Sequence, residues 1–228
     1  MPLTQSYQRV KDSVVRVLAL NGQNVSSFGS GSVVGNGCTV LTCAHCIVAG
    51  AQIAIADPTN PNRAFAGTVL FQDNAADIAL ITFPNTVGTP VTFSNSSLCK
   101  VGNGAFVVGY PMGFIEQVLL SAHIASITAS DLRIDASVNH GNSGGPLFNV
   151  NGEQIGVVNA KHGSLSTFLT QVQAARPGAS ITVGGINPIQ VLQQLIDEMQ
   201  KNLNLGIGYA IPSARIKGLH PTLAGLIP

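Results

Sequence analysis

Residues 139–146 of this chain read Asn-His-Gly-Asn-Ser-Gly-Gly-Pro, and this short stretch decides which fold the sequence favours. The glycines on both sides of Ser143 allow a tight turn that β-carbons would obstruct. Such a turn can direct the backbone N–H groups of Gly141 and Ser143 into one small space. A serine beside two convergent backbone donors is typical of nucleophilic hydrolysis, in which the donors stabilise a developing oxyanion.

Two upstream residues supply the other groups that a nucleophilic serine needs. His45 follows a short apolar strand, and Asp77 stands at the start of another. A carboxylate beside an apolar strand is partly buried, and a buried charge is costly unless a donor such as a histidine ring N–H pairs with it. We therefore predict a catalytic triad of His45, Asp77 and Ser143, with Gly141 and Ser143 supplying the oxyanion hole.

The pattern of apolar residues predicts mostly strands. Short β-rich runs alternate with Gly, Asn, Ser and Pro turns through residues 14–159, which favours an antiparallel barrel or sandwich over a parallel βαβ sheet. Residues 188–203 differ, because their apolar side chains recur at spacings of three and four. We expect one amphipathic helix there, with Asn187 as its N-cap and Pro188 as its first residue.

Several of these segments together resemble the chymotrypsin-fold serine proteases, and most closely their HtrA/DegP branch. Residues 29–34 resemble the first barrel strand of that branch, residues 108–113 its Gly-x-Pro-x-Gly turn, and residues 206–213 its closing strand. Asn142, just before the serine, is typical of this branch. The resemblance implies an all-β fold of two six-stranded antiparallel β-barrels of the chymotrypsin type, with the helix near 188–203 inserted.

The same resemblance implies a domain organisation. We expect residues 1–98 to form an N-terminal β-barrel that carries His45 and Asp77. Residues 99–228 are expected to form a C-terminal β-barrel that carries Ser143, with a helical insertion at 162–204, and the two barrels make one protease unit. The family often carries a C-terminal PDZ domain, and we expect none in a chain that ends at Pro228. Many relatives are trimeric, but this property does not transfer by resemblance, so a homo-oligomer is left open.

Substrate contacts are also implied by the resemblance. Asn159, Ala160 and Lys161 fall where relatives run a strand that pairs with the substrate backbone. Ile207 falls on the wall of the pocket for the side chain before the cut, and His140 is a further candidate for substrate contact. Because Ile207 is bulky and no Asp marks the pocket base, we expect small or medium aliphatic side chains there rather than Lys or Arg.

These observations predict a serine endopeptidase that cuts polypeptide substrates through an acyl-enzyme, with no metal or organic cofactor. The alternative is a protease-fold binding or scaffold protein whose site is idle or latent. Asp73 is the rival of Asp77 for the triad, although it precedes Asn74 and resembles a turn residue.

The cysteines leave other site types open. Cys38, Cys43 and Cys46, with His45, have the residue types of a zinc or redox site, but a second ligand pair at suitable spacing is missing. In secreted relatives of the trypsin type, the cysteine after the catalytic histidine bonds one that falls at Ser30 here. That bridge is therefore absent, and we expect reduced thiols.

Composition limits the remaining partners. The chain has 228 residues with 11 Lys or Arg and 10 Asp or Glu, so its formal net charge is +1. No long-range field is available to attract nucleic acid or an anionic membrane. Residues 1–11 show no basic-then-apolar signal pattern, and no apolar run reaches the roughly 18 residues that span a bilayer. We expect no nucleic-acid or membrane partner, and a location that is cytoplasmic or undetermined.

Overall fold

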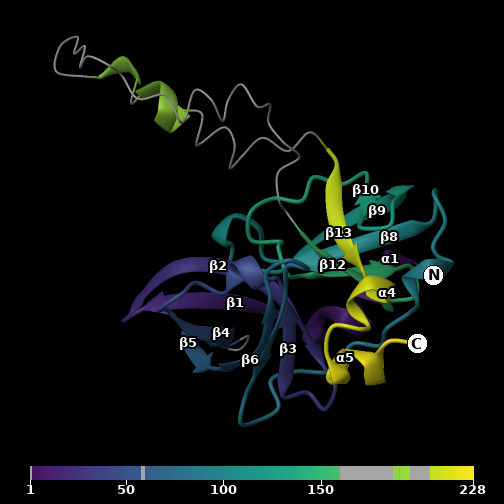
Figure 1. The fold of residues 1–228 in the computed structure, drawn as a ribbon, viewed down its shortest axis with the longest axis horizontal. Coiled ribbons are helices and arrows are strands. Elements are labelled where there is room, and N and C mark those ends of the chain that lie inside the picture. The colour runs from purple at the N-terminus through teal and green to yellow at the C-terminus, as the bar shows by residue number, and fades with distance from the viewer. Residues whose placement is uncertain (1, 58–59, 160–186, 190, 196–205) are drawn as a thin grey trace. The chain divides into compact units, whose positions relative to one another are not determined.

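The computed structural model describes residues 2–57, 60–159, 187–189, 191–195 and 206–228 (Figure 1). The chain divides into two compact units, one of residues 1–160 and 206–228 and the other of residues 161–205. Both β-sheets and all of the described candidate site residues belong to the first unit.

The first sheet contains seven strands, all antiparallel. In chain order they are β1 (Val14–Asn21), β2 (Asn24–Val34), β3 (Thr39–Thr42), β4 (Gln52–Asp57), β5 (Asn60–Ala66), β6 (Thr68–Asp73) and β7 (Ile78–Thr82). Their order across the sheet is β5-β4-β1-β2-β3-β7-β6, so the two end strands are consecutive in the chain and are separated by Gly67 alone. One bent strand thus contributes to both ends of the sheet, which curls into an incomplete barrel.

The second sheet is a closed barrel of six strands. They are β8 (Gly104–Gly109), β9 (Val118–Ile127), β10 (Leu132–Ile134), β11 (Pro146–Asn149), β12 (Gln154–Val158) and β13 (Gly208–Pro212), in the order β10-β13-β12-β11-β8-β9. Val107, Ile124, Ile134 and Leu147 lie in its buried core. Closure pairs every strand on both sides and removes exposed edges. The predicted all-β, chymotrypsin-type fold of two antiparallel sheets is confirmed, and the second is the expected six-stranded barrel. The first sheet departs from the prediction, because it has seven strands and does not close.

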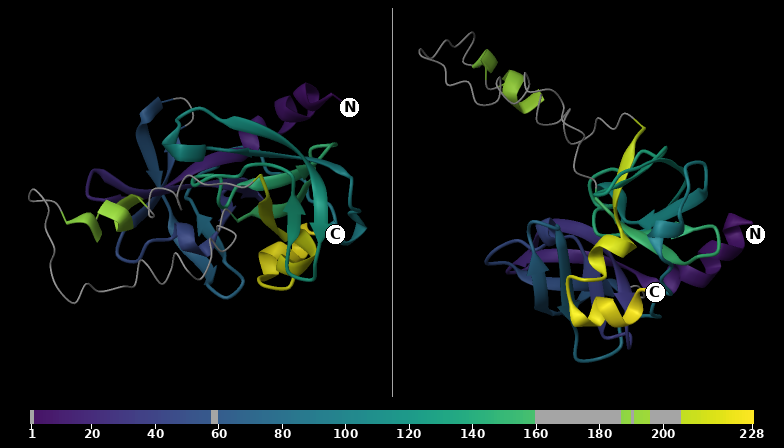
Figure 2. Two further views of the ribbon diagram at one scale, coloured as in Figure 1. Left: turned by 90° about the horizontal axis from the view of Figure 1, so that it is seen from above. Right: turned by 45° about the vertical axis from the view of Figure 1, so that its right-hand side comes forward.

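Three short helices of this unit were not predicted. They are α1 (Leu3–Val10), α4 (Ser213–Ile216) and α5 (Pro221–Leu226). The described residues also include four 3-10 turns: η1 (Lys11–Ser13), η2 (Ala44–Cys46), η3 (Ser96–Leu98) and η4 (Pro111–Gly113). Ile216 and Leu223 of the two C-terminal helices are fully buried in a cluster that includes Leu41 of β3. Figure 2 shows these two helices in yellow, next to the C-terminus. Helices this short are marginal by themselves in water, so tertiary packing rather than a periodic pattern stabilises them.

The predicted helix near 188–203 is described only in part. Residues 188–189 and 191–195 are helical, while residues 190 and 196–203 lie outside the described residues. The Asn187 side-chain oxygen accepts a hydrogen bond from the backbone N–H of Ile189 at 3.0 Å, as an N-cap residue does. The expected start of this helix is therefore present.

Candidate active site

His45 and Asp77 are brought together by the pairing of two neighbouring strands. Turn η2 holds His45 just after β3, Asp77 lies just before β7, and Thr42 of β3 faces Ala79 of β7 in the antiparallel register. The end of one strand and the start of the other are thus adjacent. Asp77 has a φ of 57°, a left-handed conformation that Asp tolerates better than most residues. In this conformation the Asp77 carboxylate contacts the His45 ring: His45 Nδ1 lies 2.9 and 3.0 Å from its two oxygens.

The buried carboxylate of Asp77 is well supplied with donors. Its oxygens accept hydrogen bonds from the His45 backbone N–H at 3.0 Å, from the His45 ring and from the Asn159 side-chain amide at 2.8 Å. Donors of this kind favour the ionised carboxylate. A carboxylate at Nδ1 assigns the ring proton to that nitrogen, which leaves Nε2 of the neutral ring as a proton acceptor. This is the arrangement that a histidine general base requires.

The environment of His45 changes its acidity. Burial by itself lowers the pKa of the ring, but the hydrogen bond to Asp77 and the interactions with the neighbouring Cys46 more than offset it, and the pKa rises from 6.5 to about 9. The His45 side chain remains 38% exposed, so the ring can still exchange protons with solvent or with a bound substrate. The neutral form that accepts a proton is therefore favoured by raising the pH.

The turn around Ser143 requires its glycines. Gly141 and Gly144 have φ values of +96° and +83°, in the left-handed region. A β-carbon on Gly141 would meet the carbonyl oxygen of Tyr110, and one on Gly144 would meet the side-chain oxygen of Thr42. Both positions therefore exclude other residues by conformation and by space.

Ser143 lies against the segment that carries His45. Its carbonyl oxygen accepts a hydrogen bond from the backbone N–H of Ser30 at 2.8 Å and one from the Cys46 thiol at 3.6 Å. On the other side, the N–H of Gly144 donates to the carbonyl of Val158 at 2.8 Å. The three predicted catalytic residues are thus gathered in one region, where β2, η2 and β12 meet.

The two peptides that carry the Gly141 and Ser143 N–H groups are held through their carbonyl oxygens. The carbonyl of His140 accepts the N–H of Met112 at 2.7 Å, and the carbonyl of Asn142 accepts the N–H of Gly145 at 3.0 Å. In a trans peptide the C=O and N–H groups point in opposite directions. The N–H groups of the following residues, Gly141 and Ser143, consequently point away from those two partners.

The structure describes three of the five residues predicted to contact substrate: His140, Asn159 and Ile207. The Asn159 side chain is directed to Asp77, and its backbone N–H donates to Tyr209 at 2.8 Å. The His140 ring packs edge-on against Phe28, with centroids 4.8 Å apart, and Ile207 is exposed just before β13. Ala160 and Lys161 lie outside the described residues.

Asp73, the rival carboxylate, has a different environment. One of its oxygens accepts the backbone N–H groups of Ala75 and Ala76, each at 2.9 Å. This is the local hydrogen bonding of an aspartate in a turn. The structure therefore gives Asp73 the turn role that its sequence context indicated.

No disulfide joins Cys38, Cys43, Cys46 and Cys99, all of which lie among the described residues. Counting along the sequence placed Ser30 opposite Cys46. The structure places Gly29 there instead, because a β-carbon built on Gly29 would lie 2.6 Å from the Cys46 sulfur. Atoms of Cys43, His45 and Asp77 that could bind a metal ion lie within 4.8 Å of one another. This set differs from the zinc or redox candidates of the sequence, which were Cys38, Cys43 and Cys46 with His45. Cys43 donates to the Val158 carbonyl at 3.4 Å, and Asp77 holds the donors given above, so a metal ion here would have to displace existing hydrogen bonds.

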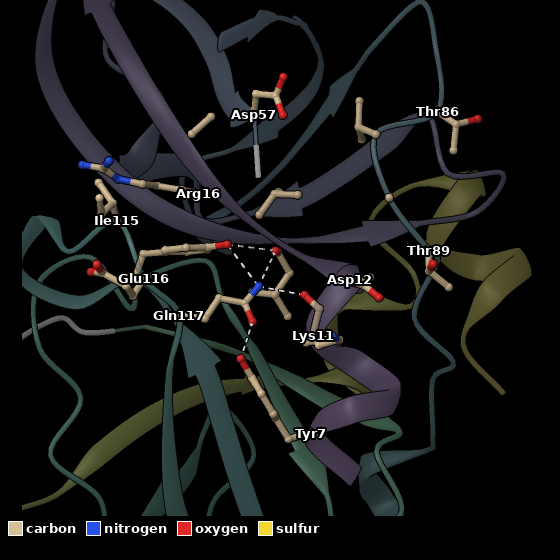
Figure 3. A pocket seen from close by; sticks show the side chains of 16 residues that line it. Tyr7, Lys11, Asp12, Arg16, Asp57, Thr86, Thr89, Ile115, Glu116 and Gln117 are labelled. Atoms are coloured by element: carbon tan, nitrogen blue, oxygen red, sulfur yellow. Dashed lines mark hydrogen bonds between the residues drawn. The ribbon is translucent and has the colours of Figure 1, made fainter. Parts of the chain in front are cut away.

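A cavity of about 840 Å³ lies apart from the predicted catalytic residues, none of which lines it. Figure 3 shows the Gln117 side chain at the centre of a hydrogen-bond network on its wall. The Gln117 amide donates to the carbonyls of Lys11 at 2.7 Å and Val14 at 3.0 Å and to the Tyr110 hydroxyl at 3.0 Å, while Tyr7 donates to its oxygen at 3.2 Å. This network ties both ends of the loop at 110–117 to the N-terminal segment, and no sequence motif indicated it.

The two antiparallel sheets, with the predicted catalytic residues gathered between them, have the architecture of a trypsin-like peptidase domain. Residues 29–157 match the family described as the trypsin-like peptidase domain, and the chain belongs to this family. Among its relatives are proteases of the HtrA/DegP type. The chain is 28% identical over 201 residues to a protein described as the serine protease HhoA of Synechocystis sp., covering 79% of this chain and 50% of that one.

Two further comparisons agree. The chain is 32% identical over 202 residues to the periplasmic pH-dependent serine endoprotease DegQ of Escherichia coli, covering 81% of this chain and 41% of DegQ. A solved structure of the HtrA-type protease AlgW with a tripeptide matches with a TM-score of 0.66 at 20% identity, over 93% of this chain and 60% of that one. The chain thus spans half or less of the length of these curated relatives.

The expected cytoplasmic location is wrong. DegQ and several DegP-like relatives are named periplasmic proteases, which points to a periplasmic or secreted location. Charge and composition describe a folded domain, and they do not distinguish the compartments in which it can work. Among the described residues, no helix combines the length and the apolar character needed to cross a membrane.

Proposed function

We propose that this chain is a serine endopeptidase that hydrolyses peptide bonds of polypeptides through an acyl-enzyme. Ser143 is the nucleophile, His45 the general base, and Asp77 the residue that orients the base. The observation that carries the proposal is the pair of 2.9 and 3.0 Å contacts between His45 Nδ1 and the Asp77 carboxylate, beside a serine whose carbonyl bonds to Cys46.

The proposed reaction divides into two similar halves. As the Ser143 oxygen attacks the substrate carbonyl carbon, its proton passes to His45 Nε2, and the carbonyl oxygen becomes an oxyanion. The amides of Gly141 and Ser143 stabilise this charge, and one such donor is worth about 3–4 kcal/mol. The oxyanion then collapses, the C–N bond breaks, and His45 gives its proton to the leaving amine. Water repeats these steps on the acyl-enzyme and releases the carboxylate product.

The proposed substrates carry a small or medium aliphatic side chain before the cut. Ile207 is 50% exposed at the entrance to β13, where it can limit the length of this side chain. Asn159, Ala160 and Lys161 are proposed to pair with the substrate backbone as an added strand. His140, next to the Gly141 amide, is proposed to line the same site.

The names of the relatives support one further proposal. A periplasmic or exported location is proposed because DegQ and DegP-like relatives are named periplasmic. A homo-oligomer stays open, and sedimentation of the purified chain distinguishes it from a monomer.

A fluorophosphonate probe tests the central proposal. We expect the wild-type protein to be labelled on Ser143, and Ser143→Ala to be unlabelled. Ser121→Ala, at an exposed position on β9, is the control and should be labelled like the wild type. A folded wild-type protein that resists the probe would instead support the idle binding or scaffold protein. Cleavage of a peptide library then reports the side chain preferred before the cut.

A further inference from the structure

Ser30 is a buried residue of the first barrel that reaches into the second. It lies on β2 with no exposed surface. Its hydroxyl donates to the carbonyl of Gly141 at 2.6 Å and accepts the backbone N–H of Tyr110 at 2.9 Å. Since the Tyr110 amide can only donate, the hydroxyl proton is left for Gly141. The direction of both hydrogen bonds is thereby determined.

These bonds complete the restraint of Gly141. The peptide before its α-carbon is held by the bond from Met112 N–H to the His140 carbonyl, at 2.7 Å. The peptide after it is held by Ser30 through the Gly141 carbonyl, and on its other side by the Asn142 N–H, which donates to the Asn139 carbonyl at 3.0 Å. Glycine rotates more freely than any other residue, so both peptide planes must be held to maintain its φ of +96°. Loss of the Ser30 bond would leave the following peptide held by the Asn142 N–H alone, so the Gly141 amide would be less firmly directed.

We infer that Ser30 is a positioning residue for the oxyanion hole. It touches neither the substrate nor the reacting atoms, and it acts by fixing the direction of the Gly141 amide. Its backbone contributes as well, because its N–H binds the Ser143 carbonyl at 2.8 Å. This inference rests on the proposed function, since the Gly141 amide matters for rate only if the chain is a serine hydrolase.

The same strand offers a matched control. Ser32 lies two residues further along β2, is equally buried, and has a hydroxyl with no hydrogen-bond partner among the described residues. Ser30→Ala and Ser32→Ala therefore make the same chemical change at the same burial. Only Ser30→Ala removes a bond to the oxyanion segment.

Kinetics of the two variants with a peptide substrate form the first test. Removing an oxyanion donor lowers kcat by about 100- to 1,000-fold, and misdirecting one should cost part of that, about 10- to 100-fold. We expect this loss in Ser30→Ala with KM unchanged within about twofold, and no loss in Ser32→Ala. Should Ser30→Ala not fold, Ser30→Cys replaces the strong donor with a weak one and carries the same expectation.

Inhibitors separate positioning from a general structural effect. A valine-terminated peptide aldehyde forms an oxyanion on Ser143, whereas the corresponding peptide alcohol has no carbonyl oxygen to place in the hole. Ser30→Ala should weaken binding of the aldehyde by the same factor by which it lowers kcat. Binding of the alcohol should be unchanged. Equal losses for both inhibitors, or wild-type kcat in folded Ser30→Ala, would overturn the inference.

Hydrogen exchange gives a readout that does not need activity. We expect faster amide exchange in Ser30→Ala at residues 110–113 and 139–143, and unchanged exchange in Ser32→Ala. If the wild type is inert towards probe and substrate, the proposed function fails, yet this local increase would still show that Ser30 holds the segment. Unchanged exchange at both segments would refute the positioning role even in an active enzyme.

Discussion

The side-chain amide of Asn159 donates a 2.8 Å hydrogen bond to Asp77 Oδ2, the same oxygen that lies 2.9 Å from His45 Nδ1. The two residues are 82 positions apart in the chain, and Asn159 follows β12 of the second barrel. The second barrel therefore helps to hold the carboxylate that is proposed to orient the base in the first.

Asn159→Leu removes this donor at nearly constant volume. A hydrogen bond to a charged group contributes about 1.5–3 kcal/mol, so we expect lower stability and a kcat reduced by roughly 3- to 10-fold. Urea unfolding and steady-state kinetics measure the two effects. Asn85→Leu, at an exposed position, is the control and should change neither. A kcat equal to that of the wild type would show that His45 and the backbone suffice to hold Asp77.

The pKa of His45 sets the pH dependence of the proposed reaction. Its hydrogen bond to Asp77 and its contact with Cys46 raise the pKa to about 9 despite the opposing effect of burial. The base works only when neutral, so kcat/KM should rise with pH through a limb centred near this value. A pH–rate profile measures the limb, and a midpoint near 6.5, the ordinary histidine pKa, would contradict the prediction.

Asp77→Asn separates the two contributions to this limb. The variant removes the carboxylate charge and presents an amide to His45, so the pKa of the ring should fall and the limb should move to lower pH. Loss of this charge and tautomer control also lowers kcat, by about 10,000-fold in enzymes of this type. If the pH–rate limb of Asp77→Asn had the same midpoint as that of the wild type, the contact with Cys46, and not Asp77, would be the cause of the raised His45 pKa.

Gly144→Ala should be strongly destabilising. Its β-carbon would meet the Thr42 hydroxyl and the Ser30 carbonyl, in a backbone with φ of +83°. Gly50→Ala is the matched control, because Gly50 has a φ of +79° and nothing within 4 Å of a β-carbon. We expect about 1 kcal/mol of destabilisation for Gly50→Ala, from conformation alone, and at least about 3 kcal/mol for Gly144→Ala, from conformation and overpacking. Similar losses in urea unfolding would mean that the turn relaxes to admit a side chain.

Gln117→Met tests the network beside the cavity. It keeps the length of the side chain but removes the donor of the Lys11 carbonyl, while the Val14 carbonyl keeps a 3.4 Å bond from the Tyr110 hydroxyl (Figure 3). An unsatisfied buried group costs about 1–3 kcal/mol, so we expect a loss in this range and faster hydrogen exchange in α1. Gln23→Met, at an exposed position, should have no effect in either measurement.

Much of the fold could be predicted because its signals are local. The turns rich in Gly and Asn, the short strands and the Asn187 N-cap each depend on residues a few positions apart. Helix α1 was missed because its eight residues are stabilised by contacts such as the 2.6 Å bond from Ser6 to the Val150 carbonyl. That bond joins residues 144 positions apart, and no periodicity records it.

The sequence by itself determined the residue types of the candidate site, because glycines that flank a serine and short apolar strands beside a histidine and an aspartate are local chemistry. Only the tertiary structure decided which distant groups support them: Asn159 on Asp77, Ser30 on Gly141, and Gly29 rather than Ser30 opposite Cys46. The reason is geometric. Side-chain periodicity indicates which face of a strand is buried. It does not indicate which residue lies across that face, because this depends on how the two barrels pack. Ser30 and Gly141, 111 positions apart in the chain, come into contact only through that packing.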